Sequence, residues 1–178
     1  MMRFLKHRTA AWARNEDGNA SVEFVIVVPV FIAMMIMSIE LGYVTLRQTM
    51  LERGLDIAVR DIRLSTSTSP QHSEIKQTIC DEAMIIPNCS SNLRLEMISA
   101  DPRNFTGINP VPDCVDLSQP AKPLRAFENG QSNELMILRA CAIYDPIFPE
   151  DMLGEKLIKA SNGQPAFVSM SAFVQEPS

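Results

Sequence analysis

The strongest pattern in the chain is an apolar run from Phe24 to Ile39, sixteen residues without a formal charge. Glu40 is the only charged residue between this run and Arg47. As a helix with about 1.5 Å rise per residue, the segment from Val22 to Leu46 would be about 37 Å long. A hydrocarbon core of about 30 Å needs about 20 mostly apolar residues. The pattern therefore predicts one membrane-spanning helix near the N-terminus.

Helical periodicity continues beyond the apolar run. Residues recur at alternating spacings of three and four, apolar except for one glutamine: Leu41, Val44, Gln48, Leu51, Leu55, Ala58 and Ile62. This spacing predicts a single helix over residues 20–64 with a packing stripe on its second half. The stripe would contact either the chain's own globular domain or sister helices. Gly54 costs about 1 kcal/mol relative to alanine in a helix, but it does not interrupt the stripe.

A polar linker and one further helix are expected next. Residues 65–70 are rich in serine and threonine and end in proline, which is typical of a linker. Ser73 is the expected N-cap of the second helix, and Pro87 would stop it. The apolar face of this helix would hold Ile75, Ile79 and Ala83.

Alternating apolar residues predict three strands in the rest of the chain. The predicted strands are residues 92–100, 134–144 and 166–174. In the first strand, Arg94 and Glu96 would lie on the side opposite to the apolar residues. Residues 101–133 contain five prolines and little periodicity, which indicates a long loop.

Together these elements predict an α+β protein, in which a long membrane-spanning helix extends into a small antiparallel sheet domain with one packed helix. At 178 residues the chain has room for one modest domain besides the membrane segment. The expected divisions are a basic leader at 1–18, a transmembrane and extended helix at 19–64, a linker at 65–72 and an exported domain at 73–178.

The net charge of −5 is divided unevenly along the chain. Residues 1–18 carry a net charge of +2, and the remaining residues carry −7. Phosphate binding needs clustered Lys and Arg, and no such cluster follows the apolar run in the sequence. The charge pattern therefore argues against a nucleic-acid partner.

Four cysteines, Cys80, Cys89, Cys114 and Cys141, follow the apolar run. An even number in a domain of about a hundred residues is typical of disulfides in an oxidising compartment. The alternative is four buried thiols in the cytosol. Four cysteines allow three connectivities and the sequence does not decide among them. We favour Cys80–Cys89, which closes a short loop, and Cys114–Cys141, which ties the proline-rich loop to a strand.

The orientation of the span rests on these cysteines. Four basic residues precede the apolar run and four arginines follow it, so the positive-inside rule gives a tie. Disulfides on the C-terminal side favour a cytoplasmic N-terminus and an exported C-terminal domain.

The order of features around Gly18 differs from that of a secretory signal peptide. In a signal peptide the small-residue cleavage site follows the apolar region, whereas Gly18 precedes it. Cleavage after Gly18 would leave the membrane helix on the mature chain, with a new amine on Asn19 that could pair with the carboxylate of Glu23. An uncleaved cytoplasmic tail on a signal anchor is the alternative.

Two further residues of the span indicate a packed environment. Pro29 would leave the carbonyl of Val25 without its helical partner, so a kink or local loosening is expected. Ionisable residues near a span are costly and usually have partners. Glu40 would therefore either find a partner or extend to the outer membrane interface.

The sequence carries no pattern that points to catalysis. A catalytic triad needs a histidine, and His72, the only one after the leader, lies in the expected linker, where we expect it to be solvated. The cysteines form no Cys-x-x-Cys pair, and neither a glycine-rich phosphate loop nor a metal-ligand spacing is present. We therefore expect a protein that is not an enzyme and that has no cofactor or metal.

The segment Gly18-Asn19-Ala20-Ser21-Val22-Glu23-Phe24 resembles the processing site of pilins of the Tad (tight adherence) system. Over about residues 16–64 the chain looks like the TadE-like minor pseudopilins of that system. The features that narrow the resemblance are Val22-Glu23-Phe24, Pro29, Glu40 followed by Gly42, Arg53 and Arg60. Phe24 departs from the tyrosine that major pilins often have there. TadE-like and TadF-like pseudopilins are not separated by these features.

The resemblance implies a non-catalytic minor pseudopilin that takes part in biogenesis or initiation of an adhesive Tad/Flp-type pilus. A prepilin peptidase would cut after Gly18 and read Asn19, Glu23 and Phe24, while Pro29, Glu40 and Gly42 would serve helix packing. The implied partners are membrane lipid, the prepilin peptidase, other Tad pilins and pseudopilins, and the inner-membrane assembly platform. The implied location is the bacterial inner membrane, single pass, with a periplasmic C-terminal domain, in or beside a surface pilus. The rival interpretation is a signal-anchored periplasmic binding or scaffold protein of the cell envelope.

Overall fold

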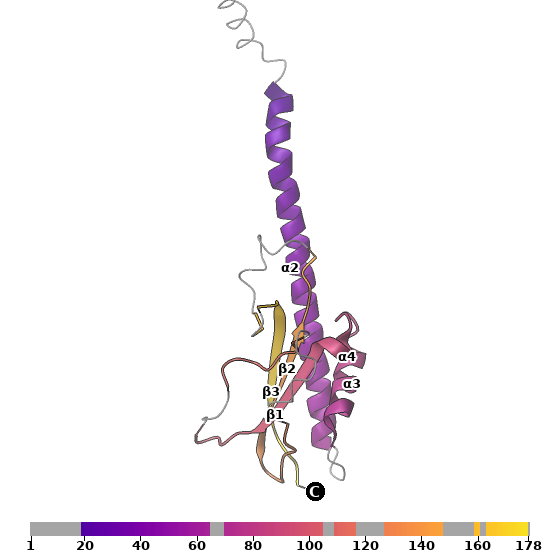
Figure 1. Ribbon diagram of the computed structural model, residues 1–178, viewed down its shortest axis with the longest axis vertical. Helices are drawn as coiled ribbons and strands as arrows, with labels where there is room; N and C mark the ends of the chain where they lie inside the picture. Colours follow the sequence, from indigo (N-terminus) through magenta and orange to yellow (C-terminus); the bar gives the residue numbers. More distant parts are fainter. Residues whose placement is uncertain are drawn as a thin grey trace, which may run out of the picture. The chain divides into compact units, whose positions relative to one another are not determined.

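The computed structural model describes residues 19–64, 70–104, 109–116, 127–147, 159–160 and 163–177 (Figure 1). The helices in these ranges are α2 (Asn19–Leu64), α3 (His72–Glu82) and α4 (Cys89–Asn92). The strands are β1 (Leu93–Ser99), β2 (Leu135–Ile143) and β3 (Ala166–Val174). The protein is α+β, as the sequence predicts, with a long N-terminal apolar helix that leads into a small sheet.

The chain divides into two compact units, Met1–Ile39 and Glu40–Ser178, which we call the N-terminal and the C-terminal unit. The described part of the N-terminal unit is the first half of α2. The C-terminal unit begins within α2 at Glu40 and contains α3, α4 and the sheet.

The sheet has the order β1–β2–β3, and both pairs of strands are antiparallel. Leu138, in the central strand, lies opposite Met97 of β1 and Ser171 of β3. The sequence predicts all three strands to within one residue at each end, and β3 has the predicted bounds. Their alternation of β-branched, aromatic and other apolar residues is what a pleated and largely buried strand needs.

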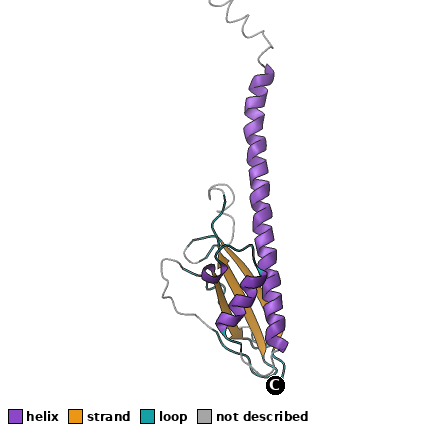
Figure 2. Cartoon of the chain, turned by 90° about the vertical axis from the view of Figure 1, so that its right-hand side faces the viewer, coloured by secondary structure: helices purple, strands orange, loops and turns teal. Residues whose placement is uncertain are grey.

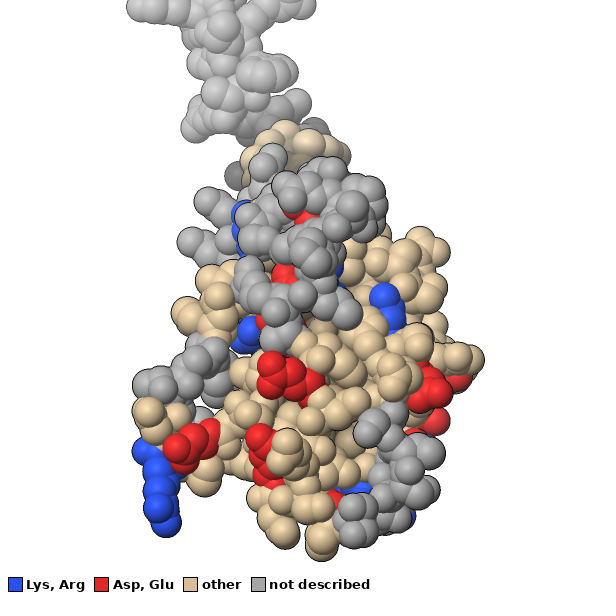
Figure 3. Space-filling model, turned by 60° about the horizontal axis from the view of Figure 1, so that its bottom comes forward, with Lys and Arg blue, Asp and Glu red and all other residues tan. Residues whose placement is uncertain are grey.

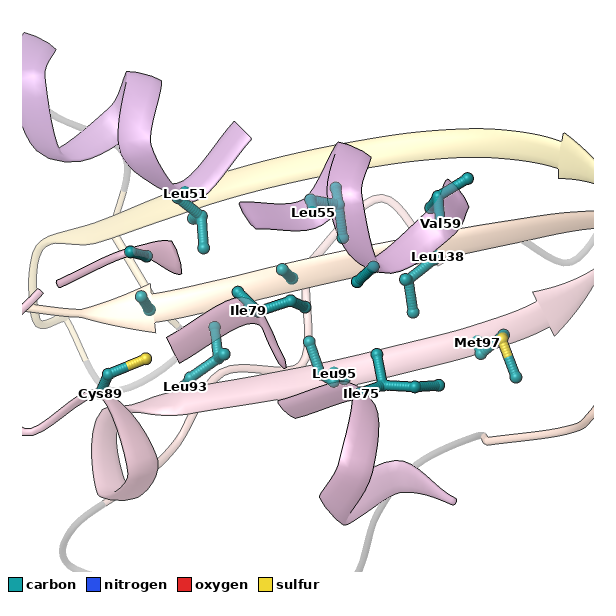
Figure 4. Close-up of a cluster of buried hydrophobic side chains, with 14 of the residues drawn as sticks. Leu51, Leu55, Val59, Ile75, Ile79, Cys89, Leu93, Leu95, Met97 and Leu138 are labelled. Carbon is teal, nitrogen blue, oxygen red and sulfur yellow. The ribbon is translucent and has the colours of Figure 1, made fainter. Parts of the chain in front are cut away.

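The helices cover one face of this sheet (Figure 2). Figure 4 shows Leu51 and Leu55 of α2 together with Ile79 of α3, turned toward Leu95 of β1 and Leu138 of β2. Fully burying such a side chain stabilises the fold by about 1.5–3 kcal/mol. The apolar stripe of α2 therefore packs on the chain's own sheet, which was one of the two alternatives left open.

The stripe is confirmed only over part of its predicted length. Leu51, Leu55, Ala58 and Ile62 are buried, but Leu41 is 55% exposed. The periodicity of a helix continues regardless of where its neighbours end, so the sequence could not show where packing on the sheet stops.

Three predictions at the ends of elements are wrong. The N-cap of α3 is Gln71 and not Ser73, so His72 belongs to the helix and not to the linker. The carboxylate of Glu74 accepts the Gln71 N–H at 2.9 Å, which satisfies one of the free donors of the first turn. α3 ends at Glu82, five residues before Pro87, because Ala83 leaves the helical conformation as its C-cap. Residues 65–69 of the predicted linker lie outside the described residues.

The short helix α4 was not predicted. Asn88 precedes it with a φ of 48°, a left-handed conformation that asparagine tolerates better than most residues. The turn at Asn88 places Cys89 at the start of α4, where its side chain is part of the apolar core (Figure 4).

Candidate functional site: the apolar helix and its entry into the C-terminal unit

The first half of α2 exposes its apolar side chains. The exposed fraction is 67% for Phe24, 65% for Ile26 and 56% for Phe31. The helix has the length and composition of a membrane span, and none of its most apolar window of 18 residues is buried within the protein. Exposed apolar surface of this extent indicates lipid or another protein as its normal surroundings.

The predicted processing residues lie at the beginning of this helix. Gly18 lies outside the described residues, and Asn19 is the first residue of α2. Glu23 and Phe24 follow about one turn later, and both side chains are exposed. The described residues therefore leave the Glu23 carboxylate accessible to a partner, without showing one.

Pro29 and Gly42 also lie on exposed parts of α2. The helix continues without a break through Pro29, although the proline ring removes the donor to the carbonyl of Val25. A side chain at Gly42 would meet no atom within 4 Å. Among the described residues, therefore, Gly42 has no neighbour that a side chain would meet, and the packing role of Pro29 and Gly42 stays a prediction.

Glu40 differs from the other polar residues of the apolar segment because it is buried, with 4% exposure. One of its carboxylate oxygens, Oε1, accepts the N–H of Ile147 at 3.1 Å. The other, Oε2, is buried and has no hydrogen-bond partner among the described residues. The structure thus supports a Glu40 that is partnered within the protein over one that extends to the membrane interface.

Arg47 and Tyr144 also lie near Glu40. The guanidinium carbon of Arg47 lies 5.9 Å from the ring centroid of Tyr144 and 6.0 Å from that of Tyr43. The Tyr144 ring stacks on Phe167 of β3 at 4.1 Å. Burial, and then the nearby charge of Glu40, raises the pKa of Tyr144 to about 12. The phenol is therefore neutral over the whole physiological range.

The four cysteines form two disulfides, Cys80–Cys89 and Cys114–Cys141. This is the favoured one of the three connectivities. The first bridge joins α3 to α4, and the second joins residues 109–116 to the central strand. Each bridge closes a loop of the unfolded chain, which typically stabilises a small exported domain by about 2–4 kcal/mol.

The sheet face opposite to the helices carries a buried ionic network that was not predicted from the sequence. The Nε of Arg94 lies 2.6 Å from Asp113, and the Nε of Arg139 lies 2.7 Å from Glu96. Glu96 also accepts the backbone N–H of Asp113 at 3.1 Å. The network and the Cys114–Cys141 bridge together fasten residues 109–116 onto the sheet. The signal in the sequence was an arginine, Arg139, within an otherwise apolar strand.

His72 is not the solvated linker residue that the sequence predicts. It lies at the start of α3, half-buried, with its ring edge-on to Phe127 at 5.1 Å. Burial, and then the positive charges of Lys76 and Arg94, lowers the pKa of His72. Nothing in this arrangement gives the imidazole a catalytic partner within the described residues.

The described residues contain no group of three or more His, Cys, Asp or Glu that could hold a metal ion. On the face drawn in Figure 3, basic side chains are scattered among acidic and neutral ones and form no continuous patch. The surface in that view does not resemble a phosphate-binding face.

Within the described residues, these features define a protein with one helix apolar enough to span a membrane and a disulfide-linked α+β unit. Residues 18–60 match the family model described as "TadE-like protein". The chain is therefore TadE-like over the apolar helix and its extension, and the resemblance found from the sequence is confirmed there. The search of curated proteins and the search of solved structures each found no match.

Proposed function

We propose that the protein is a non-catalytic minor pseudopilin that takes part in biogenesis or initiation of an adhesive Tad/Flp-type pilus. The observation that carries this proposal is the TadE-like match over residues 18–60. It falls on a helix whose first half exposes a continuous apolar surface. Such a surface can lie in lipid before assembly and against other pilin helices afterwards.

The proposed processing site is the bond between Gly18 and Asn19. The family match begins at Gly18, at the boundary between the basic leader and the helix. A prepilin peptidase would cut here and leave a new amine on Asn19, four residues and about one helical turn before Glu23. Asn19, Glu23 and Phe24 are the residues that we propose it recognises with Gly18.

The proposed location is the bacterial inner membrane, with the leader in the cytoplasm and the C-terminal unit in the periplasm. Two disulfides in the C-terminal unit support an oxidising compartment on that side. The proposed partners are membrane lipid, the prepilin peptidase, other Tad pilins and pseudopilins, and the inner-membrane assembly platform.

The mature N-terminus tests the proposal directly. With an active Tad prepilin peptidase, mass spectrometry of the membrane-extracted protein should find a chain that begins at Asn19. Gly18→Leu, and wild-type protein beside an inactivated peptidase, should both leave the precursor uncut. Chains that begin only at Met1 or Met2 beside an active peptidase would favour the signal-anchored envelope protein instead.

A further inference from the structure

The apolar run is too short for a membrane when it is measured between charges. Phe24 to Ile39 spans sixteen residues, which is about 24 Å of helix. A hydrocarbon core is about 30 Å thick, and a span needs about 20 residues. Extension toward the N-terminus meets Glu23 at once, and extension toward the C-terminus meets Glu40.

The burial of Glu40 removes the second of these two limits. Its side chain is 4% exposed and is held by the Ile147 N–H, so its charge is not presented to the surroundings of the helix. The next charged residue is Arg47. The surface of α2 that is free of exposed charge therefore extends from Phe24 to Leu46, about 35 Å of helix. That length is sufficient to cross a bilayer.

The outer surface of α2 between Glu40 and Arg47 is apolar. Leu41, Tyr43 and Leu46 are 55%, 45% and 42% exposed. Two hydroxyls lie between Leu41 and Leu46. That of Thr45 donates to the Leu41 carbonyl of its own helix at 2.8 Å, and that of Tyr43 is a phenol, a group typical of the headgroup level. A hydroxyl that is satisfied within its helix can lie in lipid at little cost.

The segment after β2 adds an apolar side chain at the same level. The Ile147 N–H binds Glu40, while its side chain is 50% exposed. We propose that Leu41, Tyr43, Leu46 and Ile147 form a membrane-docking surface, which we call the interface collar. It would lie in the interfacial layer of the bilayer, so that the base of the C-terminal unit is partly immersed in lipid.

A lipid surface suits the collar for two reasons. Three of the collar residues lie on α2, the same helix as the apolar span. The proposed function places that span in the membrane, and this inference therefore rests on the proposed function. Tyrosine is also enriched at the headgroup level, and arginine side chains can anchor a helix end there. The guanidinium carbon of Arg47, at the end of the uncharged surface, lies 6.0 Å from the Tyr43 ring centroid.

Depth measurements on the full-length chain in vesicles of phosphatidylethanolamine and phosphatidylglycerol test the collar. All four native cysteines are paired, so one added cysteine can carry a nitroxide. Ile147→Cys and Leu46→Cys report on the collar, and Val30→Cys reports on the span. Met84→Cys, at a side chain that is 84% exposed, is the aqueous reference. We expect labels at Ile147 and Leu46 to lose most of the collisions with a water-soluble nickel chelate that occur at Met84, and to keep collisions with oxygen.

The outcomes separate the collar from the proposed function. Nickel access at Ile147 equal to that at Met84, with Val30 still in lipid, would overturn the collar alone. Nickel access at Val30 as well would overturn the membrane span and the proposed function with it. A label at Ile147 that is shielded from both nickel and oxygen would show a protein cover, such as a second copy, and would also overturn the proposal.

A pair of charge substitutions provides a second test. Ile147→Glu should raise the nickel access of the Leu46 label. A carboxylate in the collar is costly to place in lipid, so this part of the C-terminal unit should move from the bilayer interface into water. Val111→Glu is the matched control, since Val111 is also apolar and 46% exposed but lies on residues 109–116. It should leave the Leu46 label unchanged. Peptide mapping of both disulfides confirms that each variant is folded. An Ile147→Glu protein with unchanged access at Leu46 would overturn the docking role.

Discussion

The carboxylate of Glu96 joins three parts of the C-terminal unit. It lies on β1, accepts Nε of Arg139 on β2, and accepts the backbone N–H of Asp113 from residues 109–116. The side chains of Glu96 and Arg139 are only 7% and 11% exposed. In such a place each charge depends on its partner, because neither can recover its hydration when the other is removed.

Glu96→Ala should therefore destabilise the protein by about 3–5 kcal/mol, since it leaves the Arg139 charge buried without its carboxylate. Glu96→Leu combined with Arg139→Met should cost clearly less than the two single changes added together. Urea unfolding of the full chain in detergent, with the disulfides intact, measures both. Glu176→Ala is the control, because its pair with Arg63 is about half exposed and should cost about 0–1 kcal/mol. Equal losses from Glu96→Ala and Glu176→Ala would contradict a buried network.

His72 should make stability depend on pH. Burial, and then Lys76 and Arg94, lowers its pKa in the folded state below the usual 6.5. The unfolded chain then binds the proton more readily, so the stabilisation is complete above about pH 6.5 and is lost as the pH falls from there toward the folded-state pKa. Unfolding experiments between about pH 7.5 and about pH 5.5 should show this loss in the wild type. In His72→Gln the same titration should be flatter, and an unchanged slope would assign the pH dependence to other groups.

At the scale of elements, the close approach of α2 and α3 depends on Gly54. A Cβ at this position would lie 2.9 Å from the carbonyl oxygen of Ile79 and 3.3 Å from its side chain. Backbone atoms cannot move aside as the end of a flexible side chain can. From the sequence, Gly54 looked like a tolerated cost within the helix, but the structure shows that the second helix needs the space.

Gly54→Ala and Gly42→Ala form a matched pair on the same helix. Alanine gains about 1 kcal/mol over glycine in helix propensity, and overpacking typically costs about 1–3 kcal/mol. Gly42→Ala should leave stability unchanged or higher, since nothing lies within 4 Å of the new Cβ. Gly54→Ala should lower stability, because the clash with the α3 backbone outweighs the propensity. Denaturant unfolding of both proteins decides the sign, and a stabilised Gly54→Ala protein would show that α3 can shift away.

The elements with a strong period were predictable, and those that depend on a distant partner were not. The sixteen uncharged residues and the stripe through Leu51 and Leu55 specify α2, because helix period and burial agree there. Alternation placed Arg94 on the side of β1 opposite to the apolar residues, but nothing in the neighbouring sequence shows that Asp113 would cover it. The burial of Glu40 likewise depends on Ile147, more than a hundred residues along the chain. Local pattern gives the elements, and long-range pairing decides which of their polar residues are buried.

At the scale of the whole molecule, α2 serves two kinds of contact. Its second half is held by the sheet, with Leu51 and Leu55 fully buried, while its first half has no apolar residue buried among the described residues. A helix that is only an anchor gains nothing from a carboxylate at the beginning of its span, where removing the charge should ease insertion. Glu23 therefore separates the proposed pseudopilin from a signal-anchored envelope protein.

Glu23→Ala should still be inserted and still be cleaved after Gly18, yet it should fail to support pilus assembly or to crosslink with other pilins. The reason is that the new amine of Asn19 would lose the carboxylate that neutralises it in apolar surroundings, in the same chain or in a neighbour. The measurement is a count of surface pili, with crosslinking, in a complemented deletion strain. Glu52→Ala is the control, because Glu52 is an exposed carboxylate of the same helix within the C-terminal unit, and it should support normal pili. Wild-type pili from the Glu23→Ala protein would show that the carboxylate has no such role, and an anchor whose first charge only marks the membrane boundary would then be the better account.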